Sequence, residues 1–208
     1  MIKLLNENCM KVMSKYENNY FDLAIVDPPY GIGDFSNKSE NKLRGVTRGV
    51  FGNIKWNDEI PQNKYFKELS RISKDRIIWG ANYYNCFEGD NGAIVWYKRT
   101  KHPNYSDCEI ASYSKGVKVS IVDCEWYSLN RCETTIHPCQ KPIKLYRWLL
   151  ENYAKPGQKI LDTHLGSGSS AIAAHYFGVD FVGCEIDKDY FDAMKKRFTE
   201  ETKQVSFL

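Results

Sequence analysis

The tetrapeptide Asp27-Pro28-Pro29-Tyr30 carries the residue types needed to activate an amino group. An aromatic amine is a poor nucleophile because its lone pair is delocalised into the ring. A carboxylate that accepts one N–H, together with a backbone carbonyl that accepts the other, can aim that lone pair at an electrophile. The prolines fix the carbonyl direction because their φ angle is locked, and the tyrosine ring can stack on a base. A proline-rich turn without chemistry is the alternative for this motif alone.

A second group of residues, in the last third of the chain, has the order of a nucleotide-binding unit. A short strand is predicted to run into Asp162, a turn with Gly166 and Gly168 follows, and a later strand leads to Glu185. The glycines let a ligand approach the backbone closely, and Glu185 can accept hydrogen bonds from both ribose hydroxyls. The turn lacks the third glycine of dinucleotide sites, and Asp162 would repel a pyrophosphate but attract an ammonium group. These features favour S-adenosylmethionine over NAD.

Together these segments resemble the amino-methyltransferase family of DNA methyltransferases over most of the chain. The similar segments are the tetrapeptide at 27–30, HPCQKP at 137–142, DTHLGSGSS at 162–170 and GCEIDKDYFDAMKKRF at 183–198. In the family these correspond to the catalytic motif, the segment that closes over the methionine end of the cofactor, the glycine loop, and the strand, acid and helix that follow. The tetrapeptide precedes the glycine loop, which is the permuted order of the family's β group. The resemblance implies an S-adenosylmethionine-dependent enzyme that methylates an exocyclic amino nitrogen in DNA.

The resemblance also implies a role for each matching residue. The target base would be held by Asp27, Pro28, Pro29 and Tyr30. The cofactor would be bound by Asn8, Cys9, Asp27, Gln140, Lys141, Asp162, Gly166, Gly168, Ser169 and Glu185. Within this set, Asp162 and Gly166 would lie under the methionine moiety, and Gln140 and Lys141 would approach the cofactor carboxylate, to which Lys141 offers charge. No metal site is expected.

Two positions depart from the family pattern DPFxGSGTT, because Thr163 and His164 stand where proline and phenylalanine are usual. His164 can fill the phenylalanine position by shape, and a packed or solvent-facing imidazole without a catalytic role is the alternative. The segments at 80–82 and 106–109 also look similar to the family and are expected to be structural supports.

The acceptor atom is predicted to be adenine N6. In the family that this chain resembles, members with aspartate in the tetrapeptide mostly methylate adenine, and members with serine there more often methylate cytosine. Cytosine N4 stays open as an alternative. So do methylation of RNA or of a protein amide nitrogen, and a catalytically inert DNA-binding protein with the same fold.

The partner implied by the resemblance is double-stranded DNA with its target base flipped out, because the amino group is hidden inside the base stack. Two basic clusters are candidates for phosphate contacts, although solvated loops are the alternative. They contain Lys38, Lys42, Arg44 and Arg48, and Lys98, Arg99, Lys101 and His102. A mobile loop is predicted at about 31–60 and a small recognition insert at about 115–135. Both are short, so recognition would be brief or shared between the copies of a homodimer.

An α/β fold must position these residues, because predicted strands and helices alternate along the chain. Strands are predicted at 2–5, 21–26, 76–79, 92–97, 107–113, 159–161 and 180–184, and helices at 11–16, 65–73, 144–153, 170–177 and 187–199. Residues 115–130 show no clear pattern. We expect one domain spanning 1–208, with a Rossmann-like, doubly wound, mostly parallel sheet, helices on both faces, and the permuted chain order.

The composition is that of a globular protein with 42% apolar and 14% aromatic residues in 208. The net charge of +3 permits a nucleic-acid partner without arguing for one. The seven cysteines include no CxxC pair and are expected to be reduced thiols. No apolar run approaches the ~18 residues of a membrane span, and the N-terminus lacks signal-peptide features, so a cytoplasmic protein is expected. A nuclease domain is not expected in 208 residues that resemble a methyltransferase, so the protein is expected to pair with a separate nuclease, to protect phage DNA or to act alone in a host.

Overall fold

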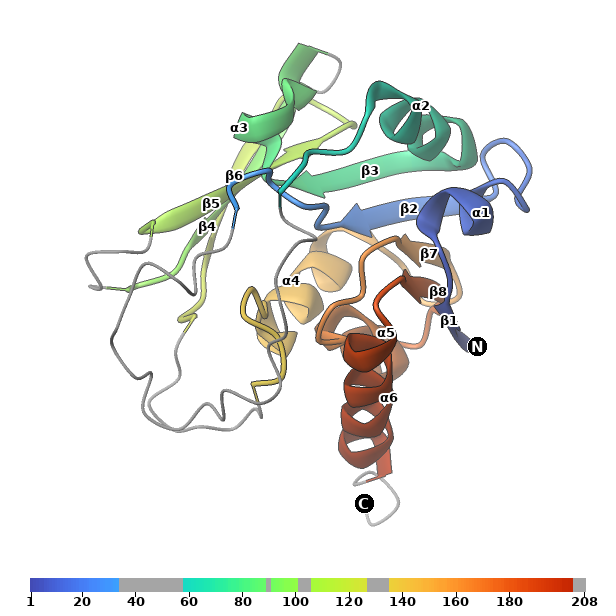
Figure 1. Cartoon of the computed structure of the whole chain (residues 1–208). Coiled ribbons are helices and arrows are strands. Elements are labelled where there is room, and N and C mark those ends of the chain that lie inside the picture. The colour runs from blue at the N-terminus through green and yellow to red at the C-terminus, as the bar shows by residue number, and fades with distance from the viewer. Residues whose placement is uncertain (34–57, 89–90, 101–105, 127–134, 204–208) are drawn as a thin grey trace.

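The computed structural model describes residues 1–33, 58–88, 91–100, 106–126 and 135–203 (Figure 1). The strands are β1 (Ile2–Asn6), β2 (Phe21–Val26), β3 (Ser73–Trp79), β4 (Gly92–Tyr97), β5 (Cys108–Tyr113), β6 (Val119–Asp123), β7 (Lys159–Asp162) and β8 (Asp180–Glu185). The helices are α1 (Cys9–Met13), α2 (Asn63–Ile72), α3 (Ala81–Tyr84), α4 (Ile143–Tyr153), α5 (Ser169–Phe177) and α6 (Lys188–Lys203), with a short 3-10 helix at Cys86–Glu88.

The strands form one sheet in the order β1-β8-β7-β2-β3-β5-β4-β6. Neighbouring strands are parallel, except that β5 runs antiparallel to both β3 and β4. The strand that carries the tetrapeptide, β2, pairs with the strand before the glycine turn, β7, through Leu23 opposite Ile160 and Ala24 opposite Leu161. Because parallel strands end at the same edge of a sheet, this pairing brings the two motifs together. The predicted mostly parallel α/β fold is confirmed.

The first strand completes the sheet beside a strand from the other end of the chain. β1 pairs with β8 in parallel, with Ile2 opposite Phe181 and Asn6 opposite Glu185. The side-chain amide of Asn6 donates a further hydrogen bond to the Glu185 carbonyl at 2.9 Å. This topology is compatible with the permuted chain order.

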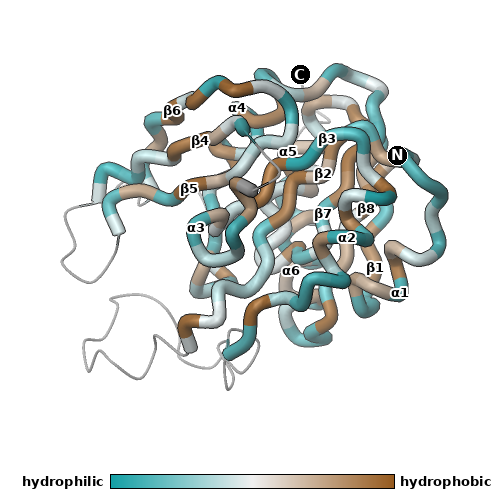
Figure 2. Tube along the Cα trace, turned by 90° about the horizontal axis from the view of Figure 1, so that it is seen from above, coloured by the Kyte–Doolittle hydropathy of each residue, from teal (hydrophilic) through white to brown (hydrophobic). Residues whose placement is uncertain are grey.

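Helices cover both faces of the sheet (Figure 1). On one face, Leu69 of α2 packs with Ala24 and Val26 of β2. On the other, Leu149 of α4 and Ala174 of α5 belong to the cluster that contains Leu23 and Ile25 of β2. Consecutive β2 residues therefore serve opposite cores, as expected for a strand buried on both faces. Figure 2 shows the corresponding concentration of hydrophobic residues in the central strands.

Two helix boundaries differ from the prediction for local reasons. α1 begins at Cys9 and not at residue 11, because Asn8 caps it by accepting a 2.9 Å hydrogen bond from the Met10 N–H. α2 ends at Ile72, and Ser73 already lies in β3 with an extended backbone.

Two differences depend on contacts beyond the local sequence. β6, which the pattern did not predict, pairs in parallel with β4, with Ala93 opposite Val119. α6 continues to Lys203, four residues beyond the predicted end, and Tyr176 of α5 donates a hydrogen bond to the Glu201 carbonyl at 2.5 Å.

Several predictions concern residues outside the described ranges. Most of the expected mobile loop and part of the recognition insert lie there, because residues 34–57 and 127–134 are not described. The same holds for the basic residues Lys38, Lys42, Arg44, Arg48, Lys101 and His102. Within the described ranges, the longest helices are too short or too polar to cross a bilayer.

Candidate active site

A single cavity of about 550 Å³ joins the tetrapeptide to the glycine loop. Asp27 and Tyr30 line one part of it, and Leu165, Gly166 and Glu185 line another. The two motifs that the sequence predicts to act together therefore face a common space. A volume of this size suits a small-molecule cofactor, since ligand pockets commonly measure about 300–1,000 Å³.

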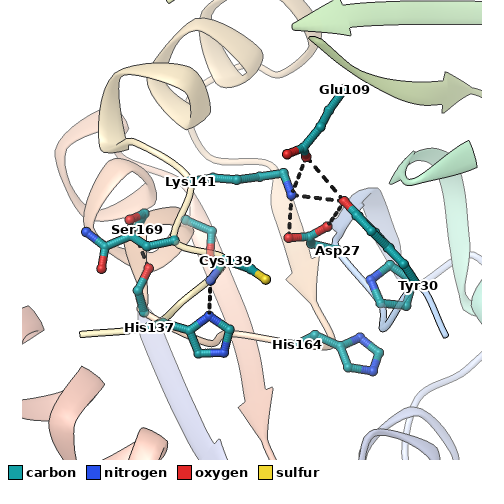
Figure 3. A network of polar contacts seen from close by, with 12 residues as sticks. Asp27, Tyr30, Glu109, His137, Cys139, Lys141, His164 and Ser169 are labelled. Atoms are coloured by element: carbon teal, nitrogen blue, oxygen red, sulfur yellow. Dashed lines mark hydrogen bonds and ion pairs between the residues drawn. The ribbon is translucent and has the colours of Figure 1, made fainter. Parts of the chain in front are cut away.

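Asp27 follows the last residue of β2, and both of its carboxylate oxygens are engaged (Figure 3). The Tyr30 hydroxyl donates to Oδ1 at 2.6 Å, and the Lys141 ammonium donates to Oδ2 at 2.5 Å. Burial raises the pKa of Asp27, while the charge of Lys141 lowers it. Each carboxylate oxygen can accept two hydrogen bonds, so Asp27 can accept a further hydrogen bond from an amine N–H.

Lys141 lies in the cavity wall, yet its ammonium points to the tetrapeptide. Its side chain is 4% exposed. Besides Asp27, Nζ lies 3.1 Å from the Tyr30 hydroxyl and 3.0 Å from Glu109 Oε2. Burial lowers the pKa of Lys141, but Asp27 and Glu109 outweigh it and raise that pKa above its usual value. The three N–H groups are thus directed to side chains of the protein, which differs from the expected role at the cofactor carboxylate.

Helix α3 supports the tetrapeptide from the side. The Tyr84 hydroxyl lies 2.5 Å from the Pro28 carbonyl oxygen and 2.7 Å from that of Pro29. The Tyr83 ring stacks on the Tyr30 ring with centroids 5.0 Å apart. Gly80, just before α3, has φ +75°, and a Cβ there would lie 2.4 Å from Tyr30 Cε1. The expectation that segment 80–82 supports the site therefore has a physical basis in this close approach.

The glycine loop is tied to the acid that follows β8. Gly166 N–H donates to Glu185 Oε2 at 2.9 Å, and Asp187 N–H donates to Oε1 at 3.0 Å. Burial raises the pKa of Glu185, while these backbone N–H groups lower it. The carboxylate keeps free acceptor sites toward the cavity, as a ribose would need.

Three of the predicted cofactor residues lie behind the cavity wall and do not line it: Asp162, Gly168 and Ser169. Asp162 is 1% exposed and accepts hydrogen bonds from His164 N–H at 2.9 Å and from the Ser170 hydroxyl at 2.6 Å. Burial raises the pKa of Asp162 to about 7, against the opposing effect of these hydrogen bonds. The contacts of Asp162 with His164 and Ser170 hold the two ends of the glycine loop together.

Arg197 of α6, which the sequence did not single out, holds the other side of the loop. Its guanidinium donates to the Ser167 carbonyl at 2.8 Å and to the Ser169 hydroxyl at 3.0 Å. Arg197 is 3% exposed. Arg197 follows Tyr190 by seven residues and Met194 by three, and this helical spacing, which places it on their face of α6, is the signal that could have identified it.

The departures Thr163 and His164 form a polar chain beside the cavity. The Tyr65 and Thr163 hydroxyls are 2.6 Å apart, and Thr163 Oγ1 lies 2.9 Å from His164 Nδ1. Burial lowers the pKa of His164 to about 4. Asn8 and Cys9 line the same cavity, although the Asn8 side-chain oxygen Oδ1 also caps α1.

The HPCQKP segment crosses the cavity wall before α4. The His137 ring packs on Tyr190 at 4.6 Å, and its Nδ1 accepts a 3.2 Å hydrogen bond from Cys139 N–H. Burial lowers the pKa of His137 to about 3, so the ring is neutral. Gln140 lines the cavity, and its side-chain oxygen accepts a hydrogen bond from Ile136 N–H at 3.1 Å.

Lys98, one of the candidates for a phosphate contact, is directed into the protein. Lys98 is 7% exposed, and its Nζ lies 2.7 Å from Glu109 Oε1. Arg99 lies at the surface but pairs with Asp123. Glu109, in the segment expected to be only a structural support, thus belongs to the polar network of the tetrapeptide.

Comparison with known proteins identifies the family. Residues 66–196, more than half of the chain, match the N6/N4 methyltransferase family described as DNA methylase. The chain is 26% identical to the Type II methyltransferase M.BglII of Bacillus subtilis, over 91% of this chain and 67% of that protein. It is 24% identical to the Type II methyltransferase M.HpaI of Haemophilus parainfluenzae, over 96% of this chain and 74% of that protein.

Solved structures share the fold. The complex of M1.HpyAVI with SAM has a TM-score of 0.60 at 18% identity, covering 95% of this chain and 100% of that one. The cytosine-N4-specific PvuII DNA methyltransferase has a TM-score of 0.63 at 11% identity, covering 97% and 90%. The chain therefore belongs to the N6/N4 DNA methylase family, whose members are S-adenosylmethionine-dependent DNA methyltransferases.

Proposed function

We propose that this protein transfers a methyl group from S-adenosylmethionine to N6 of adenine in double-stranded DNA, with the target base flipped out of the helix. The supporting observation is the common cavity, which Asp27 and Tyr30 share with Gly166 and Glu185. The aspartate of the tetrapeptide is the reason to favour adenine over cytosine.

The cavity residues suit this cofactor. Glu185 has acceptor sites for ribose hydroxyls, and the Tyr65 and Ile186 side chains provide apolar surface for a flat ring system. When bound, S-adenosylmethionine supplies an electrophilic methyl group on a sulfonium. Gly166 leaves the backbone accessible, while Asp162, Gly168 and Ser169 shape the loop that faces the ligand.

At the other end of the cavity, the tetrapeptide would hold the amino group. Asp27 accepts one N–H and the Pro28 carbonyl accepts the other, which directs the nitrogen lone pair away from the ring. Tyr30 offers a ring face to the base and holds the Asp27 carboxylate through its hydroxyl. Pro29 keeps the backbone between them rigid. Flipping costs a few kcal/mol, which contacts with DNA must supply.

The acceptor base is tested by incubating the protein with duplex DNA and isotopically labelled S-adenosylmethionine, then separating the nucleosides. N6-methyladenine is expected. N4-methylcytosine as the product would reject the adenine proposal, and labelling of RNA or protein in place of DNA would reject the DNA substrate. Sequencing of modified DNA from cells that express the protein would report the recognition site.

The role of Asp27 is tested by Asp27→Ala. Methyl transfer should fall by roughly 100- to 1,000-fold, because an interaction needed in the transition state is removed. Binding of S-adenosylmethionine, measured by calorimetry, should change little, since Glu185 and the glycine loop are untouched. Near-normal turnover of Asp27→Ala would show that the tetrapeptide is not the catalytic motif.

A further inference from the structure

Four charged side chains form a largely buried chain of alternating sign behind the tetrapeptide, and Figure 3 shows three of them, Asp27, Lys141 and Glu109. The Asp27 carboxylate contacts the Lys141 ammonium at 2.5 Å, Lys141 contacts Glu109 at 3.0 Å, and Glu109 contacts the Lys98 ammonium at 2.7 Å. The two oxygens of Glu109 are divided between the two lysines. The four groups contain two acids and two bases, so the chain is neutral as a whole.

The surroundings of the chain are aromatic. Lys98 Nζ lies 5.5 Å from the Trp96 ring and 5.6 Å from the Trp126 ring. Lys141 Nζ lies 5.4 Å from the Trp79 ring. Both lysine side chains are at most 8% exposed. Ions in such a setting interact more strongly than surface pairs, and losing one partner leaves an uncompensated buried charge.

Separate parts of the fold supply the four residues. Asp27 follows β2, Glu109 lies in the antiparallel strand β5, and Lys98 follows β4. Lys141 precedes α4. Lys98 is held in place by its backbone, since its N–H donates to the Asp107 carbonyl at 2.9 Å and its carbonyl accepts from Trp126 N–H at 3.1 Å.

We propose that Lys141, Glu109 and Lys98 are positioning residues for methyl transfer, and that their alternating charges fix the orientation and ionised state of the Asp27 carboxylate. This inference rests on the proposed function. Lys141 directs Oδ2, while Tyr30 directs Oδ1, so the carboxylate plane is set before the base arrives. Glu109 holds Lys141 on the side away from Asp27, and Lys98 balances the charge of Glu109. Burial raises the pKa of Glu109, but Lys141 and Lys98 outweigh burial and bring that pKa to about 2.

The chain makes a prediction about the pH dependence of turnover, because catalysis requires ionised Asp27. Apart from burial, the positive charge of Lys141 lowers the Asp27 pKa and the negative charge of Glu109 raises it. The titratable groups that surround Asp27 are Tyr30, Tyr84, Glu109, Cys139, Lys141, Tyr146 and Asp162. Among these groups, Lys141 carries the positive charge. Removing Lys141 should therefore raise the Asp27 pKa, and removing Glu109 should lower it.

The experiment compares kcat against pH for Lys141→Met and Glu109→Gln in the full chain, with duplex DNA and saturating S-adenosylmethionine. Lys141→Met should move the acidic limb of the profile up by roughly one pH unit or more, the size of an ion-pair effect on a carboxylate. Glu109→Gln should move it down. Both should lower kcat at the optimum by on the order of 10- to 100-fold through lost positioning, with the KM for S-adenosylmethionine within about threefold of the wild type.

Two further variants keep the test decisive. Lys98→Met/Glu109→Gln removes one charge of each sign and avoids an unpaired lysine if Glu109→Gln folds poorly. This double variant should still have a lowered kcat, because Lys141 has lost its ion pair with Glu109. Glu151→Gln, which removes an exposed carboxylate from the surface pair with Arg147 on α4, is the control and should leave the limb and kcat unchanged.

Shifts of the acidic limb in the same direction for Lys141→Met and Glu109→Gln, or wild-type kcat in the double variant, would overturn the inference. So would a KM for S-adenosylmethionine that rises with kcat unchanged in Lys141→Met, because Lys141 would then serve the cofactor. Failure of the proposed function itself has a different signature, namely Asp27→Ala with normal turnover or the absence of methylated DNA with the wild-type protein.

Discussion

The side chain of His164 lines the cavity and also affects the stability of the protein. The imidazole contacts the Tyr65 ring edge-on, with centroids 5.5 Å apart, and its Nδ1 lies 2.9 Å from the Thr163 hydroxyl. In the folded state burial lowers its pKa to about 4, below the usual value of 6.5. The folded state therefore disfavours protonation of His164. As the pH falls, the imidazole is protonated at a higher pH in the unfolded state than in the folded state.

We expect His164→Phe to become more stable than the wild type as the pH falls. A depressed histidine pKa contributes stability above pH 6.5 that is lost as the pH falls toward 4. Removing the group should change the stability difference between variant and wild type by about 2 kcal/mol in favour of the variant from pH 8 to pH 5. Urea unfolding at both pH values measures this difference. His175→Phe, at a histidine on α5 outside the cavity lining, is the control, and an equal pH-dependent change in that variant would contradict the assignment to His164.

At the scale of elements, α3 and the residue before it set the position of Tyr30. Gly80 packs so closely on Tyr30 that a Cβ would lie 2.4 Å from Cε1, and the stacked Tyr83 ring limits the movement of Tyr30. The strand end and the short helix therefore act together on one side chain of the tetrapeptide.

We expect Gly80→Ala to lower kcat at least tenfold while the affinity for S-adenosylmethionine stays near the wild-type value. The methyl group must displace Tyr30, and misplacement of a positioning group by about 1 Å can cost on the order of 100-fold. Gly157→Ala is the matched control, because Gly157 has φ +82° and no atom within 4 Å of an added Cβ. Both variants should lose about 1–2 kcal/mol of stability from backbone strain, measured by denaturant unfolding. Equal effects of the two substitutions on kcat would exclude the contact with Tyr30 as the cause.

At the scale of the whole molecule, the cavity joins segments from both ends of the chain. Asn8 follows β1, Tyr65 lies in α2, His137 precedes α4, and Glu185 ends β8. A ligand bound there contacts several elements of the sheet and both helical layers. Its binding energy should therefore add to the stability of the complete fold.

We expect S-adenosylmethionine at 100 times its Kd to stabilise the protein by about 2.7 kcal/mol, seen as a higher Tm in calorimetry. Glu185→Ala should lose most of this increase at the same concentration, because an acceptor for the ligand is removed. Glu151→Ala, at an exposed acid on α4, should keep it. A full increase in Glu185→Ala would show that the acid does not hold the cofactor.

Local sequence was sufficient to identify the motifs and most of the elements that carry them. The apolar run 21–26 followed by two prolines marks the end of a strand, because proline cannot continue the ladder. The glycine turn between two short strands can also be recognised from local sequence. Glu185 was identified because it stands at the end of the second of these strands. Parallel strands place such ends at one edge of the sheet, so the meeting of Asp27 with the glycine loop was predictable.

The tertiary structure decided the partners of the charged side chains. Lys141 belongs to the segment expected at the cofactor carboxylate, yet its ammonium contacts Asp27, 114 residues away in sequence. Lys98 stands in a basic cluster typical of a phosphate-binding loop, but the pairing of β4 with β5 directs it to Glu109. A charge has no local pattern that specifies its counter-ion, because that choice depends on which strands become neighbours and on how far water is excluded.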